Sequence, residues 1–157
     1  MTVQTAYTVD HAAAYSGQPA NENGLDIKSM VCNAVILPGR VVVRVGVTDV
    51  VKPPAAADDK VMGVAIRTLE HEVGTTQVLQ YEDEEMVAIA EAGEIWVLVE
   101  DAVAIGGAAF YRHTTSDFGL FRSDVDGGEA EALDGAYYTS AAGAGGLAKV
   151  KIPVHTP

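Results

Sequence analysis

The sequence has very little cysteine and few aromatic residues. Cys32 is the one cysteine among 157 residues, so the chain alone can form neither an internal disulfide nor a cysteine-rich zinc site. Because Cys32 lies in the apolar run 30–37, we expect a buried structural thiol and not a nucleophile. Aromatic residues make up 6% of the chain, so valine, isoleucine, leucine and alanine must supply most of a hydrophobic core.

Basic residues are also scarce. The chain has 10 lysines and arginines against 22 aspartates and glutamates, which gives a formal net charge of -12. Such a surface repels the phosphates of nucleic acids and of anionic membranes, so neither is expected as a partner. Two explanations of the charge stay open: it keeps the protein soluble, or it complements a basic or mixed protein surface.

Long hydrophobic runs are absent as well. No apolar stretch approaches the roughly 18 residues that span a bilayer, and residues 1–7 have neither the basic nor the apolar region of a signal peptide. We therefore expect a soluble protein that stays, or is assembled, inside a cell. A hydrophobic fraction of 48% is nevertheless enough for the core of one domain, with or without a tail.

Two segments have the residue types of a ligand site, but the sequence around them lacks the elements that such a site needs. Residues 143–148 fit the dinucleotide-binding pattern G-x-G-x-x-A, but that pattern needs a following helix and a distant acidic residue, and too little chain remains. We expect a flexible hairpin loop there. Residues 124–129 hold three carboxylates beside two glycines, which predicts a solvated turn, with a weak calcium site as the alternative.

The remaining polar residues form no catalytic pattern. Ser116 and Asp117 follow His113 closely, and residues so near on one turn rarely converge into a triad. The histidines show no zinc-binding spacing, and no nucleophile elbow is present. We therefore expect a protein that is not an enzyme and uses no catalytic residue, cofactor or metal. The four histidines are His11, His71, His113 and His155.

Short β-type segments joined by glycine-bearing and acidic turns fill most of the chain. Residues 40–47 alternate so that Arg40, Val42 and Arg44 share one face, which predicts a strand with one buried and one wet face. Gly63 indicates a bulge or a close backbone approach. With no convincing helix and no internal repeat, we predict a mainly β fold, a barrel or sandwich. The expected strands are residues 25–37, 40–47, 61–67, 76–81, 86–90, 94–100, 108–112, 118–122, 130–142 and 147–152.

The N-terminal segment differs from the rest. Residues 1–24 are polar and small and sustain neither a helical nor a strand period. We predict an extended arm at 1–24 followed by a β-barrel domain at 25–157, with a frayed terminus as the alternative to the arm. Tyr7 and Tyr15 lie in this arm, where no local core exists, so we expect them to contact a partner.

The order of these segments resembles the cement, or decoration, proteins of tailed bacteriophages. The likeness is one of pattern along residues 25–152 and includes no catalytic motif. It is carried by a glycine turn, a Val-x-Gly-Val strand, a tryptophan-bearing strand, an acidic-Ala-Val segment, an aromatic-Arg pair and a glycine-rich C-terminal run. These are residues 37–39, 61–64, 93–99, 101–106, 111–112 with 119–122, and 140–148.

The resemblance implies a jelly-roll-like β-barrel with no enzymatic chemistry and no cofactor. It implies a protein that binds the outside of the expanded head, clamps neighbouring major capsid subunits, and forms a dimer or trimer with itself. Such a protein is assembled in the host cytoplasm and ends on the outer surface of the virion. The residues expected at the capsid or subunit interface are Tyr7, Tyr15, Leu25, Ile27, Trp96 and Tyr111.

Two other functions remain open from the sequence. A small acidic β-barrel could bind a ligand or metal in the manner of a cupin, but cupins cluster their histidines, and here the histidines are spread from residue 11 to residue 155. A β-domain of a phage tail or baseplate would have a similar turn-rich pattern.

Overall fold

In the computed structural model, the residues that the structure describes form nine β-strands and one short 3-10 helix. The structure describes residues 14–57, 59–68, 79–114 and 116–154. The predicted mainly β fold is confirmed, and no helix among these residues has the length and apolar character needed to cross a membrane. The elements are β1 (Pro19–Cys32), β2 (Val41–Arg44), β3 (Val50–Lys52), β4 (Val61–Ala65), β5 (Met86–Leu98), β6 (Ala108–Arg112), β7 (Phe121–Arg122), η1 (Asp126–Gly128), β8 (Ala130–Tyr138) and β9 (Leu147–Ile152).

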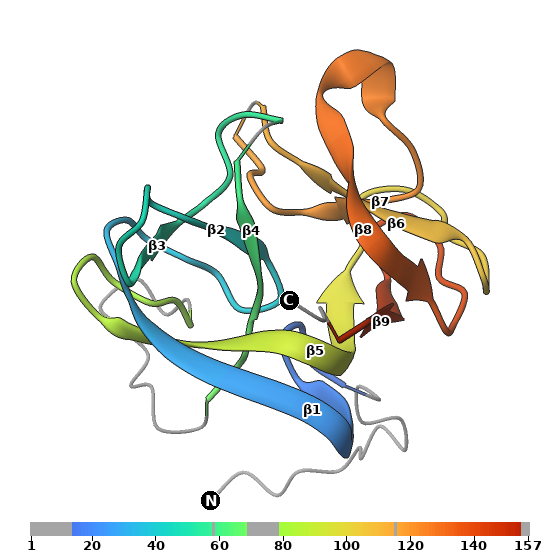
Figure 1. Ribbon diagram of the computed structural model, residues 1–157. Helices are drawn as coiled ribbons and strands as arrows, with labels where there is room; N and C mark the ends of the chain where they lie inside the picture. Colours follow the sequence, from blue (N-terminus) through green and yellow to red (C-terminus); the bar gives the residue numbers. More distant parts are fainter. Residues whose placement is uncertain (1–13, 58, 69–78, 115, 155–157) are drawn as a thin grey trace, which may run out of the picture.

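The first half of the chain closes into a small barrel (Figure 1). The hydrogen-bonded order is β1-β3-β2-β4-β5, and β5 pairs in turn with β1, which closes the ring. The β1–β3 pair is parallel and the other pairs of this ring are antiparallel. β3 lies between the expected strands 40–47 and 61–67, where the sequence analysis expected no strand. It is only three residues long, too short to give a pattern of its own.

The second half of the chain continues from the other end of β5. The order β5-β9-β8-β6-β7 is closed by a bridge between Val99 and Phe121, where the Glu100 amide also donates to the Phe121 carbonyl at 2.8 Å. Two small barrels therefore share one long strand, and Figure 1 shows β5 turning from the first barrel into the second.

The prediction of separate strands at 86–90 and 94–100 is wrong, because β5 runs through both without a break. Gly93 makes this continuity possible: its φ of 128° is one that other residues rarely adopt, and a Cβ there would lie 2.8 Å from Leu25 Cδ1. The strand can therefore bend between the two barrels while its ladder continues on both sides.

Each barrel has its own hydrophobic core. All five strands of the first barrel contribute to one cluster, and the second barrel holds a larger cluster that reaches back to β2 and β4. Val42 belongs to the first cluster and Val41 to the second, so both faces of β2 are buried. The predicted wet face is wrong here because β2 lies between two cores. Cys32 is buried in the first core, as predicted, and burial raises the pKa of its thiol.

The described part of the predicted arm lies against β5. Ala14 is buried, the Gly17 amide donates to the Trp96 carbonyl at 2.7 Å, and the Trp96 amide donates to the Gln18 carbonyl at 2.9 Å. From Pro19 onward the chain is part of β1. Residues 1–13 lie outside the described residues, so the division into an arm and a barrel stays a prediction.

Replacing Gly63 by alanine tests the close contact between β4 and β5. A Cβ at Gly63, where φ is 148°, would lie 2.1 Å from the Ala90 carbonyl oxygen, whereas at Gly24, where φ is 75°, nothing lies within 4 Å. We expect Gly63→Ala to lower the free energy of unfolding by about 3 kcal/mol or more, and Gly24→Ala to lower it by about 1 kcal/mol. Chemical denaturation measures both, and equal losses would contradict the close approach.

Candidate functional site

Two arginines of the second barrel are almost fully buried. Arg112 on β6 and Arg122 on β7 are 5% and 7% exposed. Glu100 accepts two hydrogen bonds from Arg112, at 3.0 Å from Nε and 2.7 Å from Nη2, and one from Arg122 Nη1 at 3.1 Å. Asp126 also binds both guanidinium groups, at 2.6 Å and 2.7 Å.

The same arginines bind the rest of the acidic turn at residues 124–129. Glu129 accepts from Arg112 Nη1 at 2.7 Å, and Asp124 accepts from Arg122 Nη2 at 2.7 Å. Three carboxylates that the sequence indicated as a solvated turn or a weak calcium site are thus ligands of guanidinium groups. Among the described residues, no group of histidine, cysteine and carboxylate side chains could hold a metal ion.

This ionic cluster connects the segment after β5 with β6, β7 and η1. The hydrogen bonds that Arg112 donates to Glu100, Asp126 and Glu129 raise the pKa of its guanidinium group. Burial by itself lowers the pKa of Arg122, but its ion pairs outweigh burial and raise that pKa too. Both guanidinium groups stay charged and donate their hydrogen bonds to carboxylates. The cluster therefore stabilises the folded second barrel.

The other polar segments noted in the sequence do not assemble into a catalytic site. His113 is 6% exposed, and its buried ring Nδ1 has no hydrogen-bond partner within the described ranges. Asp117 interacts with Arg40 instead, whose Nη1 donates to its carbonyl at 3.0 Å. The glycine-rich segment 143–146 turns directly into β9, a strand where a dinucleotide site needs a helix.

The structure separates the six predicted interface residues by exposure. Tyr15 is 54% exposed, with the Arg67 guanidinium 4.2 Å from its ring centroid, and Ile27 is 50% exposed. Trp96 is half-buried, with Lys149 Nζ 5.6 Å from its ring centroid. Leu25 is half-buried and packs against the larger core. Tyr7 lies outside the described residues.

Tyr111 lies inside the second barrel. It is 1% exposed, and its hydroxyl donates to Glu131 at 3.2 Å. Burial and the nearby Glu131 carboxylate raise the pKa of this hydroxyl. In this fold the ring packs against the chain itself, so Tyr111 offers no surface for a partner. The aromatic-Arg pair noted in the sequence is therefore a core residue beside a buried ion-pair residue.

An apolar stripe lies on the outer face of β1 and β5. Val31 is directly opposite Met86 in the β1–β5 ladder, and Ile27 points to the same side of β1 as Val31. Met86 is 58% exposed, although the sequence analysis did not include it among the interface residues. Its place at the first position of a strand, after an acidic turn, is the signal that could have identified it. Ile27, Val31 and Met86 form what we call the apolar stripe.

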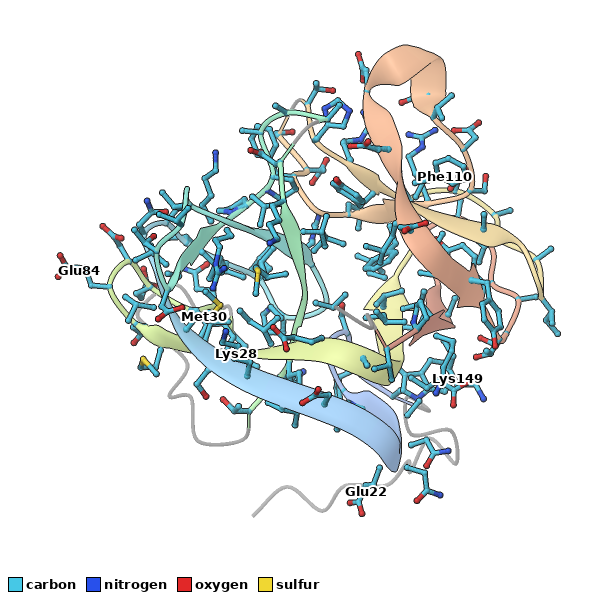
Figure 2. The ribbon with its side chains drawn as sticks, viewed as in Figure 1. Glu22, Lys28, Met30, Glu84, Phe110 and Lys149 are labelled. Carbon is cyan, nitrogen blue, oxygen red and sulfur yellow. The ribbon has the colours of Figure 1, made fainter. Side chains whose placement is uncertain are left out.

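The open end of the first barrel is lined by basic side chains. A cavity of about 490 Å³ is bordered by Lys28 on β1, Arg44 on β2 and Lys60 just before β4. Figure 2 shows Lys28 and Met30 on the same side of β1, toward β2 and β4. We call Lys28, Arg44 and Lys60 the basic mouth. Asp26, Glu91 and four apolar residues complete its lining: Val61, Met62, Ala92 and Val154.

The ionic cluster can be tested by replacing its central cation. We expect Arg112→Met to lower the free energy of unfolding by about 3 kcal/mol, because it leaves three carboxylates without their shared partner. Asp49→Asn removes an ion pair whose carboxylate side chain is 82% exposed, so its cost should be at most about 0.5 kcal/mol. Urea denaturation of both variants checks this. An equally small loss of unfolding free energy for Arg112→Met would contradict the stabilising role of the cluster.

Through Asp124, the stability that the ionic cluster contributes depends on pH. Its hydrogen bond to Arg122 lowers the pKa of its carboxyl below the ordinary value of 3.8. A lowered folded-state pKa contributes stability that is complete above the unfolded-state value and is lost as pH falls through the folded-state value. The melting temperature of Asp124→Asn should therefore lie below that of the wild type at pH 7, and the difference should vanish in strong acid. A constant difference from pH 7 to pH 2.5 would contradict this linkage.

Comparisons with known proteins find one matching family and similar solved structures. A family model described as structural cement protein (E217 gp24/Pam3 gp6) matches residues 3–153. A chain from the capsid of Myoviridae phage XM1 has a TM-score of 0.78 and 15% identity, over 97% of this chain and 98% of that chain. The N base of the head fiber gp8.5 of bacteriophage phi29 has a TM-score of 0.45 and 10% identity, over 85% and 98%.

No curated protein sequence matches the chain. The cement family is a structural one and not a class of enzymes, and membership implies a structural role in a virion, in association with capsid proteins. This favours the predicted cement function over the cupin-like and tail alternatives. The match over residues 3–153 shows that the chain belongs to the phage structural cement protein family.

Proposed function

We propose that this protein binds the outer surface of a tailed-phage head and clamps neighbouring major capsid subunits, which stabilises the expanded shell. The family match over residues 3–153 is the observation that carries the proposal. The protein acts by binding alone, as a dimer or trimer, after assembly in the host cytoplasm, and it needs neither nucleic acid nor a membrane.

The physical basis is the pressure of packaged DNA, which pushes capsid subunits apart. A protein that contacts two neighbouring subunits opposes their separation by the free energy of both contacts. A stable interface of this kind buries about 1,600 Å², and copies linked through one shell reinforce one another by avidity. A stiff, closed double barrel suits this task, because little ordering entropy is lost when a preformed surface binds.

The apolar stripe is the best-supported contact on the described surface. Ile27 and Met86 are 50% and 58% exposed on adjacent strands, so an interface can bury much of each side chain. Burial of the remaining apolar area is worth about 1 to 2 kcal/mol for each. Tyr15, Leu25 and Trp96 extend the candidate surface along β1 and β5, and Tyr7 precedes it in the chain.

Co-sedimentation with expanded shells that lack this protein tests the proposed function. Purified protein should saturate at a copy number set by the symmetry of the shell, and the saturated shells should resist heating better than bare shells. Absence of binding in mild salt would refute the cement function for this chain.

A substitution in the apolar stripe should weaken shell binding. We expect the double variant Ile27→Asp, Met86→Asp to bind expanded shells at least about tenfold more weakly, because each charge must be desolvated at the interface. Val47→Asp is the control: Val47 is 97% exposed in the turn between β2 and β3. If the stripe variant and this control bind equally well, the stripe is not part of the interface.

A further inference from the structure

We propose that the basic mouth of the first barrel binds carboxylate side chains that the capsid protein presents to it. This inference rests on the proposed function, since it assigns the chemistry of one contact with the shell. The mouth comprises Lys28, Arg44 and Lys60 around a cavity of about 490 Å³. Such a volume accommodates one or two acidic side chains that enter from a docked surface.

The first argument is the distribution of positive charge. The chain has only 10 basic residues against 22 acidic ones, and most of the others already have an anionic or aromatic partner. None of the ion pairs found within the described ranges joins Lys28 or Lys60 to a carboxylate. The basic residues with partners outside the mouth are Arg40, Lys52, Arg67, Arg112, Arg122 and Lys149.

The second argument is an unused hydrogen-bond donor. Arg44 Nε is buried and has no acceptor among the described residues, while Arg44 Nη2 contacts only the exposed Asp49 carboxylate at 3.1 Å. A buried donor without a partner is costly. Because Nε itself is buried, a carboxylate of the partner would bind the accessible part of the guanidinium group, whose side chain is 21% exposed and whose geometry suits carboxylates. The Arg44 amide also donates to the Lys60 carbonyl at 2.8 Å, which holds the backbones of two of the three cations side by side.

The third argument is access. β3 pairs with β1 only at Val31 and Cys32, so the β1 edge before Val31 has no neighbouring strand on that side among the described residues. Ile27 and Lys28 alternate across β1, one toward the apolar stripe and the other toward the mouth. A capsid surface that covers this free edge therefore contacts both features at once, whereas a small free anion would contact only the mouth.

The two acidic residues of the lining do not cancel the positive charge of the basic mouth. Asp26 and Glu91 border it, which leaves a formal charge of +1 on the lining, against -12 for the whole chain. At physiological salt, charges farther than about 8 Å are largely screened. An acidic group that reaches the mouth therefore interacts mainly with the cations beside it and little with the distant acidic surface.

The test compares two double variants with the same net charge. Lys28→Gln, Lys60→Gln removes two cations of the mouth, and Lys52→Gln, Lys151→Gln removes two that lie outside it. Each full-length protein is titrated onto expanded shells by co-sedimentation at several salt concentrations. We expect the mouth variant to bind at least about tenfold more weakly and with a smaller salt dependence, and the control variant to stay within about twofold of the wild type.

The outcomes separate this inference from the proposed function. If the wild type does not bind shells, the proposed function fails, and this inference fails with it. If the wild type binds and the mouth variant binds equally well, or both variants weaken equally, only the basic mouth is refuted. A thermal-shift titration with citrate covers the remaining case. If citrate stabilises the wild type but not the Lys28→Gln, Lys60→Gln variant, and this variant still binds shells like the wild type, the mouth is a site for a small anion. That result would overturn its assignment to the capsid.

Discussion

The structure depends on one strand, β5, which belongs to two closed barrels at once. Its first half pairs with β1 and β4, and its second half pairs with β9 and the beginning of β1. Backbone groups are therefore bonded on both edges over most of its length, which fixes the two barrels relative to each other. Gly93 allows the bend between the halves, and Gly63 allows β4 to approach the Ala90 carbonyl closely.

The features proposed as contacts follow from this arrangement. Met86, the exposed side chain of β5, lies opposite Val31 of β1, on the outer face to which Ile27 also points. Because β3 covers only the end of β1, the barrel stays open beside Lys28. The apolar stripe and the basic mouth thus meet at a single free edge. The ionic cluster of Arg112 and Arg122 serves a different purpose, since its groups bind one another within the second barrel.

The sequence predicted the class of fold, but it held no signal for the order in which the strands pair. Alternating valines and glycine turns are local signals, so most strands and the buried Cys32 could be predicted from them. The prediction of a wet face on β2 is wrong at Val42, because Val42 packs into the core of the first barrel while Val41, on the opposite face, packs into the core of the second. A core on each side of one strand is a long-range arrangement that the local alternation of residues does not reveal. The interface prediction for Tyr111 is wrong for a similar reason. An aromatic residue suits an interface and a core equally well, and only the long-range pairing of β6 with β7 and β8 places the Tyr111 ring inside the barrel.

The charge of the chain also has a different meaning once the structure is known. A net charge of -12 indicates an acidic surface, yet Glu100 and Asp126 bind the two most buried arginines and so contribute little to that surface as free anions. Composition cannot distinguish a carboxylate that binds Arg112 from one that faces water. In the same way it cannot show that Lys28 and Lys60, at one barrel end, have no ion-pair partner in the described part of the chain. The location of the unpaired charges, more than their sum, therefore determines which protein surface this molecule can bind.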